Sequence, residues 1–566
     1  MADISKIRIL NTDYDIKDET ARNIIDKQLY SFGTLNEMTS STLLKNGDFA
    51  KTLGFYEIND GGSANYYIRT KTNNEVVNNI TLFEITNDLV AELVFKDTLN
   101  YLQIGGKIND NSYDATNLIQ NAINILENKN QGKLILPSGK IYITGTITLK
   151  QNVEIIGFND YSTWNGNASI ENNGTIIYHI PITACNLFNV DNINLSYGYL
   201  PNIVLKNLYI IGNSYSTIAL NLTKVAKSIF ENLMIKNFQT NILIDYCMEN
   251  DFINIFSQMA YSNCLLIQKL IGLNTSQNFQ NCYFGQTRWE WSTGYPLKIE
   301  NDSIENANFI NCLFESSNKS ITIGNGNIIN FENIYVENIP ATQNVPTFDI
   351  GKTASTVNGI INITNGFILG SIDEPNTSNH TIFDINYIDA LKIDGVYVAN
   401  SGKLLNTTTN TGNIICNNII EKNVTNNILP FINSNNVSWF NYQNIDNPTL
   451  NYYLPRQNLN YAQLTNYENN WESYSNGCRY TKIGNLVYLE LSLKAGTVAN
   501  LTQILGTLPN DITPNVPIFC ELRNVSNVLD NNTKVIIASD IRVPNSSSNS
   551  FVSGDMYQGA ITYMVN

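Results

Sequence analysis

Glu315 and Glu337 stand at equivalent places in two copies of a short sequence pattern. Each lies four positions after an asparagine, Asn311 or Asn333, and the two glutamates are 22 residues apart. Two carboxylates about 5 Å apart suit a retaining glycosidase, and a wider separation suits an inverting one. If the copies stack, the pair has the groups for an acid together with a nucleophile or base. A solvated pair on a turn, relieved by Lys319, is the structural alternative.

A second chemically rich segment ends at Tyr295. It holds Trp289 and Trp291, which face the same side of an extended strand because they are two residues apart. Indole rings can stack on the C–H faces of sugars, and Arg288 can bind hydroxyls or an acidic substituent. Glu290 adds a further candidate catalytic carboxylate. The segment predicts a glycan-binding surface, with packing of the tryptophans in a core as the alternative.

A third group of carboxylates consists of Asp245, Glu249 and Asp251. Asp251 is the member that we expect to supply a catalytic partner. The alternative is that all three are exposed loop carboxylates, which need no chemical role.

Metal and cofactor chemistry is not expected. The chain has two histidines, His179 and His380, and its eight cysteines include no CxxC pair, so a zinc site or a histidine-based triad lacks its raw material. A Ca²⁺-dependent lyase would want an Asp-rich cluster on successive repeats, and none stands out. Catalysis would therefore rely on carboxylates, Tyr, Lys or Arg, without a metal or cofactor.

The composition restricts the partners. The 566 residues are 43% hydrophobic and 15% charged, with a net charge of −15 and no long Lys/Arg run, which argues against nucleic acid. The sequence has no uninterrupted 18-residue apolar run and no signal-peptide pattern, so we expect neither membrane insertion nor export by the usual route. A polyanionic ligand would need a local basic groove, for instance from Arg288, Lys298 and Lys319, whereas a neutral or amino-sugar glycan is electrostatically easier.

A repeat positions these residues. Its template is the hexapeptide 205–210, LKNLYI, with apolar residues at the first, fourth and sixth places and Asn at the third. The third-place residues follow one another at intervals of 25, 22, 27, 30, 22, 32, 30 and 23 residues. The nine third-place residues are Asn207, Asn232, Asn254, Asn281, Asn311, Asn333, Asn365, Gly395 and Asn418.

This period predicts a parallel β-helix in which each interval is one coil of about three short strands. The segments are β-branched and aromatic and are separated by Asn, Gly and Ser, unlike leucine-rich or helical repeats. Asn tolerates the left-handed conformation at a sharp bend, and stacked amides can bond to one another along the coils. We expect the third-place asparagines to be structural, and Cys282 and Cys312, which follow two of them, to be reduced core thiols.

The segment before the repeat carries a family resemblance. Residues 110–123 read DNSYDATNLIQNAI, with an apolar helical stripe and Asp114 as an N-cap, and residues 134–142 read LILPSGKIY. These residues resemble the opening of the pectate-lyase-like right-handed parallel β-helix of bacteriophage tailspikes and polysaccharide depolymerases. The resemblance covers roughly residues 98–430 and departs from the family at Asn111-Ser112, where an acidic pair is common. The helix, near 114–127, would cap the open end of the coils.

The flanks extend the resemblance. Residues 44–68 are similar to an N-terminal module of phage tail fibres, and the alternating stretch 479–493, with a hairpin turn at Gly484-Asn485, resembles C-terminal β-sandwich domains of phage tail proteins. We therefore expect a mainly β chain with an attachment region at 1–97, a right-handed parallel β-helix at 98–430, a linker at 431–460 and a C-terminal β-sandwich at 461–566 for trimerisation or receptor binding.

The resemblance implies a homotrimeric tailspike of the virion tail, made in the host cytoplasm and joined to phage tail or collar proteins through its N-terminus. It would recognise a bacterial surface glycan such as capsule, wall polysaccharide or teichoic acid. It would also degrade that glycan as a depolymerase, by hydrolysis rather than by lyase chemistry. A receptor-binding protein that only adsorbs to the glycan is the main alternative, and a free bacterial polysaccharide lyase or hydrolase is the third. The glycan, and whether its groove lies within one chain or between chains, stay open.

Overall fold

A computed structural model describes the chain as two compact units, residues 1–430 with 444–448 and residues 431–443 with 449–566. The described residues are 6–9, 12–15, 29–86, 88–158, 174–190, 198–285, 294–337, 345–351, 359–370, 381–407, 411–424, 437–440, 443–444, 462–463, 472–473, 478–483, 486–495, 504–508, 513–514, 517–524, 532–538, 540–542 and 556–564. Among them, no helix is long and apolar enough to cross a membrane.

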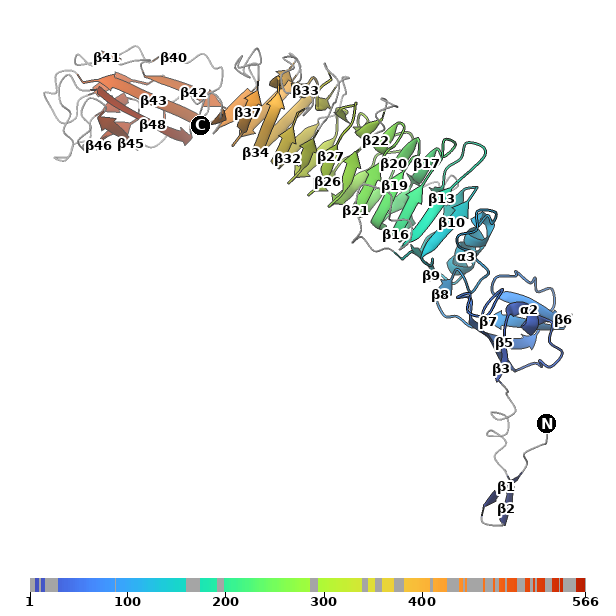
Figure 1. Ribbon diagram of the computed structural model, residues 1–566. Coiled ribbons are helices and arrows are strands. Elements are labelled where there is room, and N and C mark those ends of the chain that lie inside the picture. The colour runs from blue at the N-terminus through green and yellow to red at the C-terminus, as the bar shows by residue number, and fades with distance from the viewer. Residues whose placement is uncertain are drawn as a thin grey trace. The chain divides into compact units, whose positions relative to one another are not determined.

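The body of the first unit is a parallel β-helix, as predicted. Its coils follow one another from β10, in cyan, to β37, in orange (Figure 1). Each coil contributes strands to a sheet that bends at the third-place residue of the repeat and one strand to a second sheet, and consecutive coils pair in parallel.

Within the described residues the bent sheet has 22 strands and the second sheet has ten. The second sheet contains β11 (Ile147–Leu149), β14 (Phe188–Val190), β17 (Ile218–Thr223), β20 (Thr240–Asp245), β22 (Asn263–Gln268), β25 (Tyr295–Ile299), β28 (Ile321–Ile323), β31 (Phe348–Ile350), β33 (Thr381–Ile385) and β35 (Lys403–Thr407). The bent sheet contains β8 (Thr98–Asn100), β9 (Gly132–Ile135), β10 (Gly139–Ile143), β12 (Val153–Ile156), β13 (Thr175–His179), β15 (Leu200–Pro201), β16 (Val204–Ile211), β18 (Val225–Ala226), β19 (Ile229–Lys236), β21 (Met248–Gln258), β23 (Thr275–Gln280), β24 (Tyr283–Gly285), β26 (Ala307–Ile310), β27 (Leu313–Glu315), β29 (Ile328–Glu332), β30 (Tyr335–Glu337), β32 (Ile360–Leu369), β34 (Ile388–Ser401), β36 (Thr411–Asn417), β37 (Ile420–Val424), β38 (Val437–Phe440) and β39 (Gln443–Asn444).

The third-place residues form the predicted corner. All nine have positive φ, between 51° and 67°, which is the left-handed conformation that Asn and Gly tolerate. Their amides also bond along the coils, because the Nδ2 of Asn232 donates to Asn207 at 2.9 Å and that of Asn254 donates to Asn232 at 3.0 Å. Asn333 donates in the same way to Asn311 at 3.2 Å. The third-place residues are therefore structural.

The interior of the β-helix is a stack of phenylalanines from successive coils. The rings of Phe252, Phe279 and Phe309 are nearly parallel, with centroids 4.7 and 4.6 Å apart. Cys282 and Cys312 are buried beside this stack and are free thiols, as predicted.

Helix α3 (Thr116–Asn128) covers the N-terminal end of the coils and buries Ile119, Ala122, Ile123 and Leu126 against the first strands. Its N-cap is Ala115, which corrects the expected Asp114. Asp114 instead accepts hydrogen bonds from Thr116 and from Thr144, so it fastens the start of the helix to the first coil.

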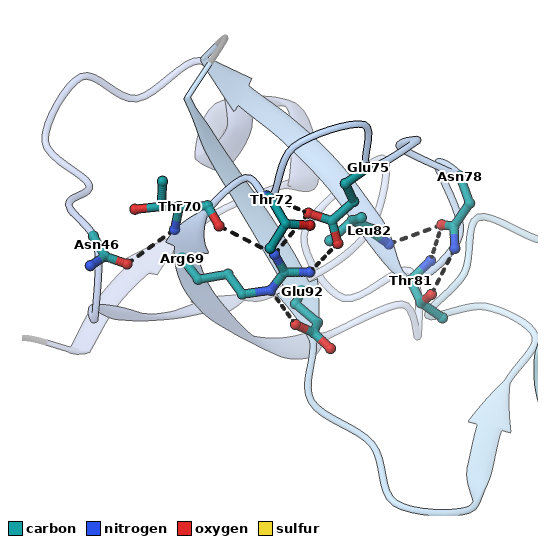
Figure 2. A network of polar contacts seen from close by, with 9 residues as sticks. All are labelled: Asn46, Arg69, Thr70, Thr72, Glu75, Asn78, Thr81, Leu82 and Glu92. Atoms are coloured by element: carbon teal, nitrogen blue, oxygen red, sulfur yellow. Dashed lines mark hydrogen bonds and ion pairs between the residues drawn. The ribbon is translucent and has the colours of Figure 1, made fainter.

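An N-terminal module precedes the coils. Its sheet has the order β3-β4-β5-β7-β6, with β3 (Leu29–Phe32), β4 (Phe49–Thr52), β5 (Ala64–Thr70), β7 (Leu89–Leu93) and β6 (Leu82–Thr86), and helix α2 (Leu35–Thr39) packs beside it. Arg69 holds this sheet to the following loop, because its guanidinium binds Glu75 through both terminal nitrogens and Glu92 through Nε at 2.6 Å (Figure 2). A separate hairpin joins β1 (Lys6–Ile9) and β2 (Thr12–Asp15).

The second unit is an antiparallel sheet with its own core. The predicted hairpin is confirmed, since β42 and β43 pair antiparallel with Ile483 opposite Leu486. Val487, Leu489, Leu491 and Leu493 alternate into the core. The strands are β40 (Ala462–Gln463), β41 (Glu472–Ser473), β42 (Arg479–Ile483), β43 (Leu486–Lys494), β44 (Ile504–Thr507), β45 (Ile518–Asn524), β46 (Asn532–Ile537), β47 (Asp540–Arg542) and β48 (Met556–Met564).

Candidate functional site

Glu315 and Glu337 end the neighbouring strands β27 and β30 and are direct register partners. Phe314 and Val336, one residue earlier, are fully buried, so alternation turns both glutamates to the outer face of the bent sheet. Both are half-buried. Parallel strands lie about 4.8 Å apart, so the backbones present the two carboxylates side by side on consecutive coils.

Two tyrosines stand beside the pair, each two residues before the end of its strand. The Tyr335 hydroxyl donates a hydrogen bond of 2.7 Å to Oε2 of Glu337. Burial and this hydrogen bond raise the pKa of Tyr335 to about 12, so its hydroxyl is a proton donor at neutral pH. Tyr283 lies on the coil before Glu315. Burial, and then the charge of Glu315, raise the pKa of Tyr283, which also remains protonated.

The Tyr283 hydroxyl is a further polar group at this place. Only 3% of the residue is exposed, and its hydroxyl lies close enough to the Glu315 carboxylate to interact with it. The hydroxyl can therefore donate to the Glu315 carboxylate and help to orient it.

Gly285 occupies the register position of the pair on the preceding coil, opposite Glu315. A Cβ on Gly285 would lie 2.3 Å from the carbonyl oxygen of Glu315, closer than any side chain tolerates. The column of outward residues at this offset therefore runs Gln258, Gly285, Glu315, Glu337 and Leu369, with no side chain immediately before the pair.

Arg288, Trp289, Glu290 and Trp291 lie outside the described residues. The described ends of their segment both contact the coil of Glu315: Gly285 pairs with Glu315, and the carbonyl of Gly294 accepts a 2.9 Å hydrogen bond from Ser317.

Tyr295, the remaining predicted binding residue, begins β25 and is half-buried. The Nζ atoms of Lys298 and Lys319 lie 6.0 and 5.9 Å from its ring centroid. Lys319 belongs to the turn that follows Glu315, so this aromatic and cationic cluster lies around one corner of the coil from the carboxylates.

Asp251, the other predicted catalytic carboxylate, does not lie next to Glu315 and Glu337. It lies three residues before its corner residue Asn254, whereas Glu315 lies four residues after Asn311 two coils further on. Its Oδ1 accepts a 3.0 Å hydrogen bond from Asn278, and Asn308, Asn330 and Asn362 continue this second amide ladder.

The structure adds a second carboxylate pair that the repeat search missed. Asp349 on β31 and Asp384 on β33 are register partners on the outer face of the second sheet. Asp349 is only 8% exposed, and Asp384 accepts a 2.8 Å hydrogen bond from Asn406. The signal was the tripeptide Phe-Asp-Ile, which occurs at 348–350 and again at 383–385. The described residues contain no group of three or more His, Cys, Asp or Glu that could hold a metal ion.

Comparisons with known proteins give a likeness of fold. The sequence matches no family model and no curated protein. The structure is similar to a tailspike of the Acinetobacter baumannii bacteriophage Fri1, a capsular polysaccharide depolymerase, with a TM-score of 0.50 and 12% identity over 94% of this chain and 97% of that one. It is equally similar to a tailspike of Acinetobacter phage vb_AbaP_AS12, with a TM-score of 0.50 and 12% identity over 93% and 95% of the two chains. The chain therefore has a fold similar to that of these phage tailspikes, with a parallel β-helix as its body, and the similarity covers nearly its whole length.

Proposed function

We propose that this chain is a phage tailspike that binds a bacterial surface glycan and cleaves it by hydrolysis. The observation that carries the proposal is the register pairing of Glu315 with Glu337 on the outer face of the β-helix. A carboxylate pair is the catalytic apparatus of most glycoside hydrolases. The likeness in fold to a capsular polysaccharide depolymerase supports the same substrate class.

We assign one catalytic role to each glutamate. Glu337 accepts the Tyr335 hydrogen bond, which fixes its orientation, so it serves as nucleophile or base. Glu315, its register partner, serves as the acid that protonates the leaving oxygen. A separation near one strand spacing is closer to the retaining arrangement of about 5 to 5.5 Å than to the inverting one.

The remaining parts of the proposal concern assembly. Ile328, Ile360, Phe367 and Ile415 are exposed on the outer face of the bent sheet in its last coils. Ile328 and Ile360 are register partners, and an exposed hydrophobic pair of this kind supports a homotrimer whose subunits meet along this sheet. The N-terminal module would bind phage tail or collar proteins, and the C-terminal unit would trimerise the spike or contact the receptor.

The test is turnover by purified protein on a panel of capsular polysaccharides, wall polysaccharides and teichoic acids, measured as released reducing ends. Glu315→Gln and Glu337→Gln should each lower turnover by about 10² to 10⁴ while binding is kept. Asp349→Asn and Asp384→Asn are matched controls, because they remove a register pair on the other sheet, and they should retain activity. An equal loss of turnover in the control variants would indicate that Asp349 and Asp384, and not the glutamates, form the catalytic site.

Binding without any released product would instead leave a receptor-binding protein that only adsorbs to the glycan. Products with an unsaturated sugar, detected at about 232 nm, would indicate a lyase and contradict the hydrolytic assignment.

A further inference from the structure

The strongest remaining feature is the cluster of Tyr295, Lys298 and Lys319. Tyr295 and Lys298 belong to β25, whereas Lys319 comes from the turn between β27 and β28 on the next coil. Both ammonium groups lie about equally far from the Tyr295 ring, at 6.0 and 5.9 Å. Two consecutive coils thus place two cations on one half-buried ring.

The charges of this cluster do not cancel. Lys298 pairs with Glu300 at 3.3 Å, whereas Lys319 makes no ion pair with any carboxylate of the described residues. The backbone of Lys319 is held instead, because its N–H donates a 3.1 Å hydrogen bond to Ser317, whose hydroxyl donates to Gly294. The cluster keeps an excess positive charge on a chain with a net charge of −15.

The position of the cluster relates it to the glutamate pair. Lys319 is the fourth residue after Glu315, so their Cα atoms are at most about 14 Å apart. A short oligosaccharide spans such a distance. The connecting turn, residues 316–320, is shorter than the equivalent connections on the coils before and after it, residues 286–294 and 338–347.

We propose that Lys298 and Lys319 bind an acidic substituent of the glycan, a carboxylate or a phosphate, while the Tyr295 ring contacts the adjoining sugar. This rests on the proposed function and deepens it, because it makes the substrate an anionic polysaccharide. Ammonium groups bind carboxylate and phosphate oxygens through charge-assisted hydrogen bonds. An acidic polymer is repelled by a surface of net negative charge and by Glu315 and Glu337, so a local excess of cations is required to hold it there.

The test compares charged and uncharged forms of one polymer. The full-length protein is titrated with polygalacturonate, with its carboxyl-reduced neutral form and with glycerol-phosphate teichoic acid, at low salt and at high salt. The wild type should bind an acidic polymer more tightly than the neutral one, and added salt should weaken that preference. Lys319→Met should raise the dissociation constant for the acidic polymer by about fivefold and leave the neutral polymer unchanged, whereas Lys319→Arg should restore binding.

Lys392→Met is the matched control. Lys392 lies on the outer face of the same β-helix but is paired with Asp394 at 3.2 Å, so its loss should not alter binding. Polygalacturonate and teichoic acid distinguish a carboxylate from a phosphate. If neither acidic polymer binds more tightly than the neutral one, or if Lys319→Met and Lys392→Met behave alike, the inference is overturned.

The outcome is separable from that of the proposed function. Glycan cleavage that depends on Glu315 but not on Lys319 would support the hydrolase proposal and contradict the acidic subsite. Charge-dependent binding that needs Lys319, without cleavage, would support the acidic subsite and contradict the hydrolase proposal.

Discussion

Gly285 and Glu315 are register partners on consecutive coils, and the backbone of one is so close to the other that no side chain fits between them. A Cβ at position 285 would lie 2.3 Å from the carbonyl oxygen of Glu315. Because the obstructing atom belongs to the backbone, it cannot move aside as a flexible side chain would. The backbone of Glu315 therefore allows only glycine at position 285, on the coil before the glutamate pair.

Gly285→Ala should consequently displace the strand of Glu315. We expect a loss of about 1 to 3 kcal/mol in stability, together with a loss of glycan cleavage. Gly366→Ala is the matched control on the same sheet, since a Cβ there would lie 3.5 Å from Ile334, an ordinary contact. Thermal unfolding at a fixed scan rate measures the first effect, and released reducing ends measure the second. Similar midpoints for the two variants would contradict the argument.

The hydroxyl of Tyr335 offers a second prediction. Tyr335→Phe removes the 2.7 Å hydrogen bond to Glu337 but keeps the ring, whose centroid lies 5.5 Å from that of Phe367. We expect kcat to fall by about tenfold, which is about 1.4 kcal/mol, with little change in stability, because the hydrogen bond orients a reacting group.

Tyr397→Phe is the corresponding control. Tyr397 belongs to the same column of rings, but the residue two positions after it is Ala399 rather than a glutamate. Its loss should leave kcat unchanged. A fall in activity of equal size in both variants would show that the hydroxyls act on the sheet and not on Glu337.

The sequence predicts the features that depend on the repeat. A residue's offset from the corner asparagine determines its strand and its face, so the pairing of Glu315 with Glu337 followed from counting. The same counting separates Asp251 from that pair, because it lies three places before its corner residue and not four places after it. The left-handed corners were also predictable, since Asn tolerates that conformation locally.

Other features needed the three-dimensional structure. Asp349 and Asp384 lie on the second sheet, 35 residues apart, and are separated by the connections 351–359 and 370–380. The repeat template describes only the corner of the bent sheet, so it could not align them. The bond from Tyr335 to Glu337 depends on side-chain rotamers, which a period does not specify. Lys298 and Lys319 meet over Tyr295 only because one coil stacks on the next.

The buried cysteines predict an order of reactivity. Burial raises the pKa of Cys264 to about 11, and burial also raises the pKa of Cys282 well above its usual range. Cys185 is only half-buried. A short iodoacetamide pulse on native protein, read by mass spectrometry, should therefore label Cys185 before Cys264 or Cys282. Detection of a disulfide between Cys282 and Cys312, or their earlier labelling, would show that the interior is open.

His179 predicts a pH dependence of stability. Its ring is fully buried, stacks on Phe238 at 5.6 Å and has Nδ1 2.8 Å from the Ser216 hydroxyl. Burial disfavours the imidazolium and lowers the pKa of His179 from 6.5 to about 4. Between pH 6.5 and about pH 4, His179 is protonated in the unfolded chain but stays neutral in the folded chain. The contribution to stability is therefore complete above pH 6.5 and is lost as the pH falls towards 4, by at most about 3 kcal/mol.

His179→Gln removes the titrating ring from this site. The variant can be less stable at neutral pH, but its stability should change less between pH 7 and pH 4.5 than that of the wild type, and the slope is the quantity to measure. His380→Gln removes the chain's other histidine and serves as the comparison. Parallel slopes for wild type and His179→Gln would mean that the folded protein protonates His179 as readily as the unfolded chain does, which a buried imidazole between Ser216 and Phe238 cannot do without opening the coil.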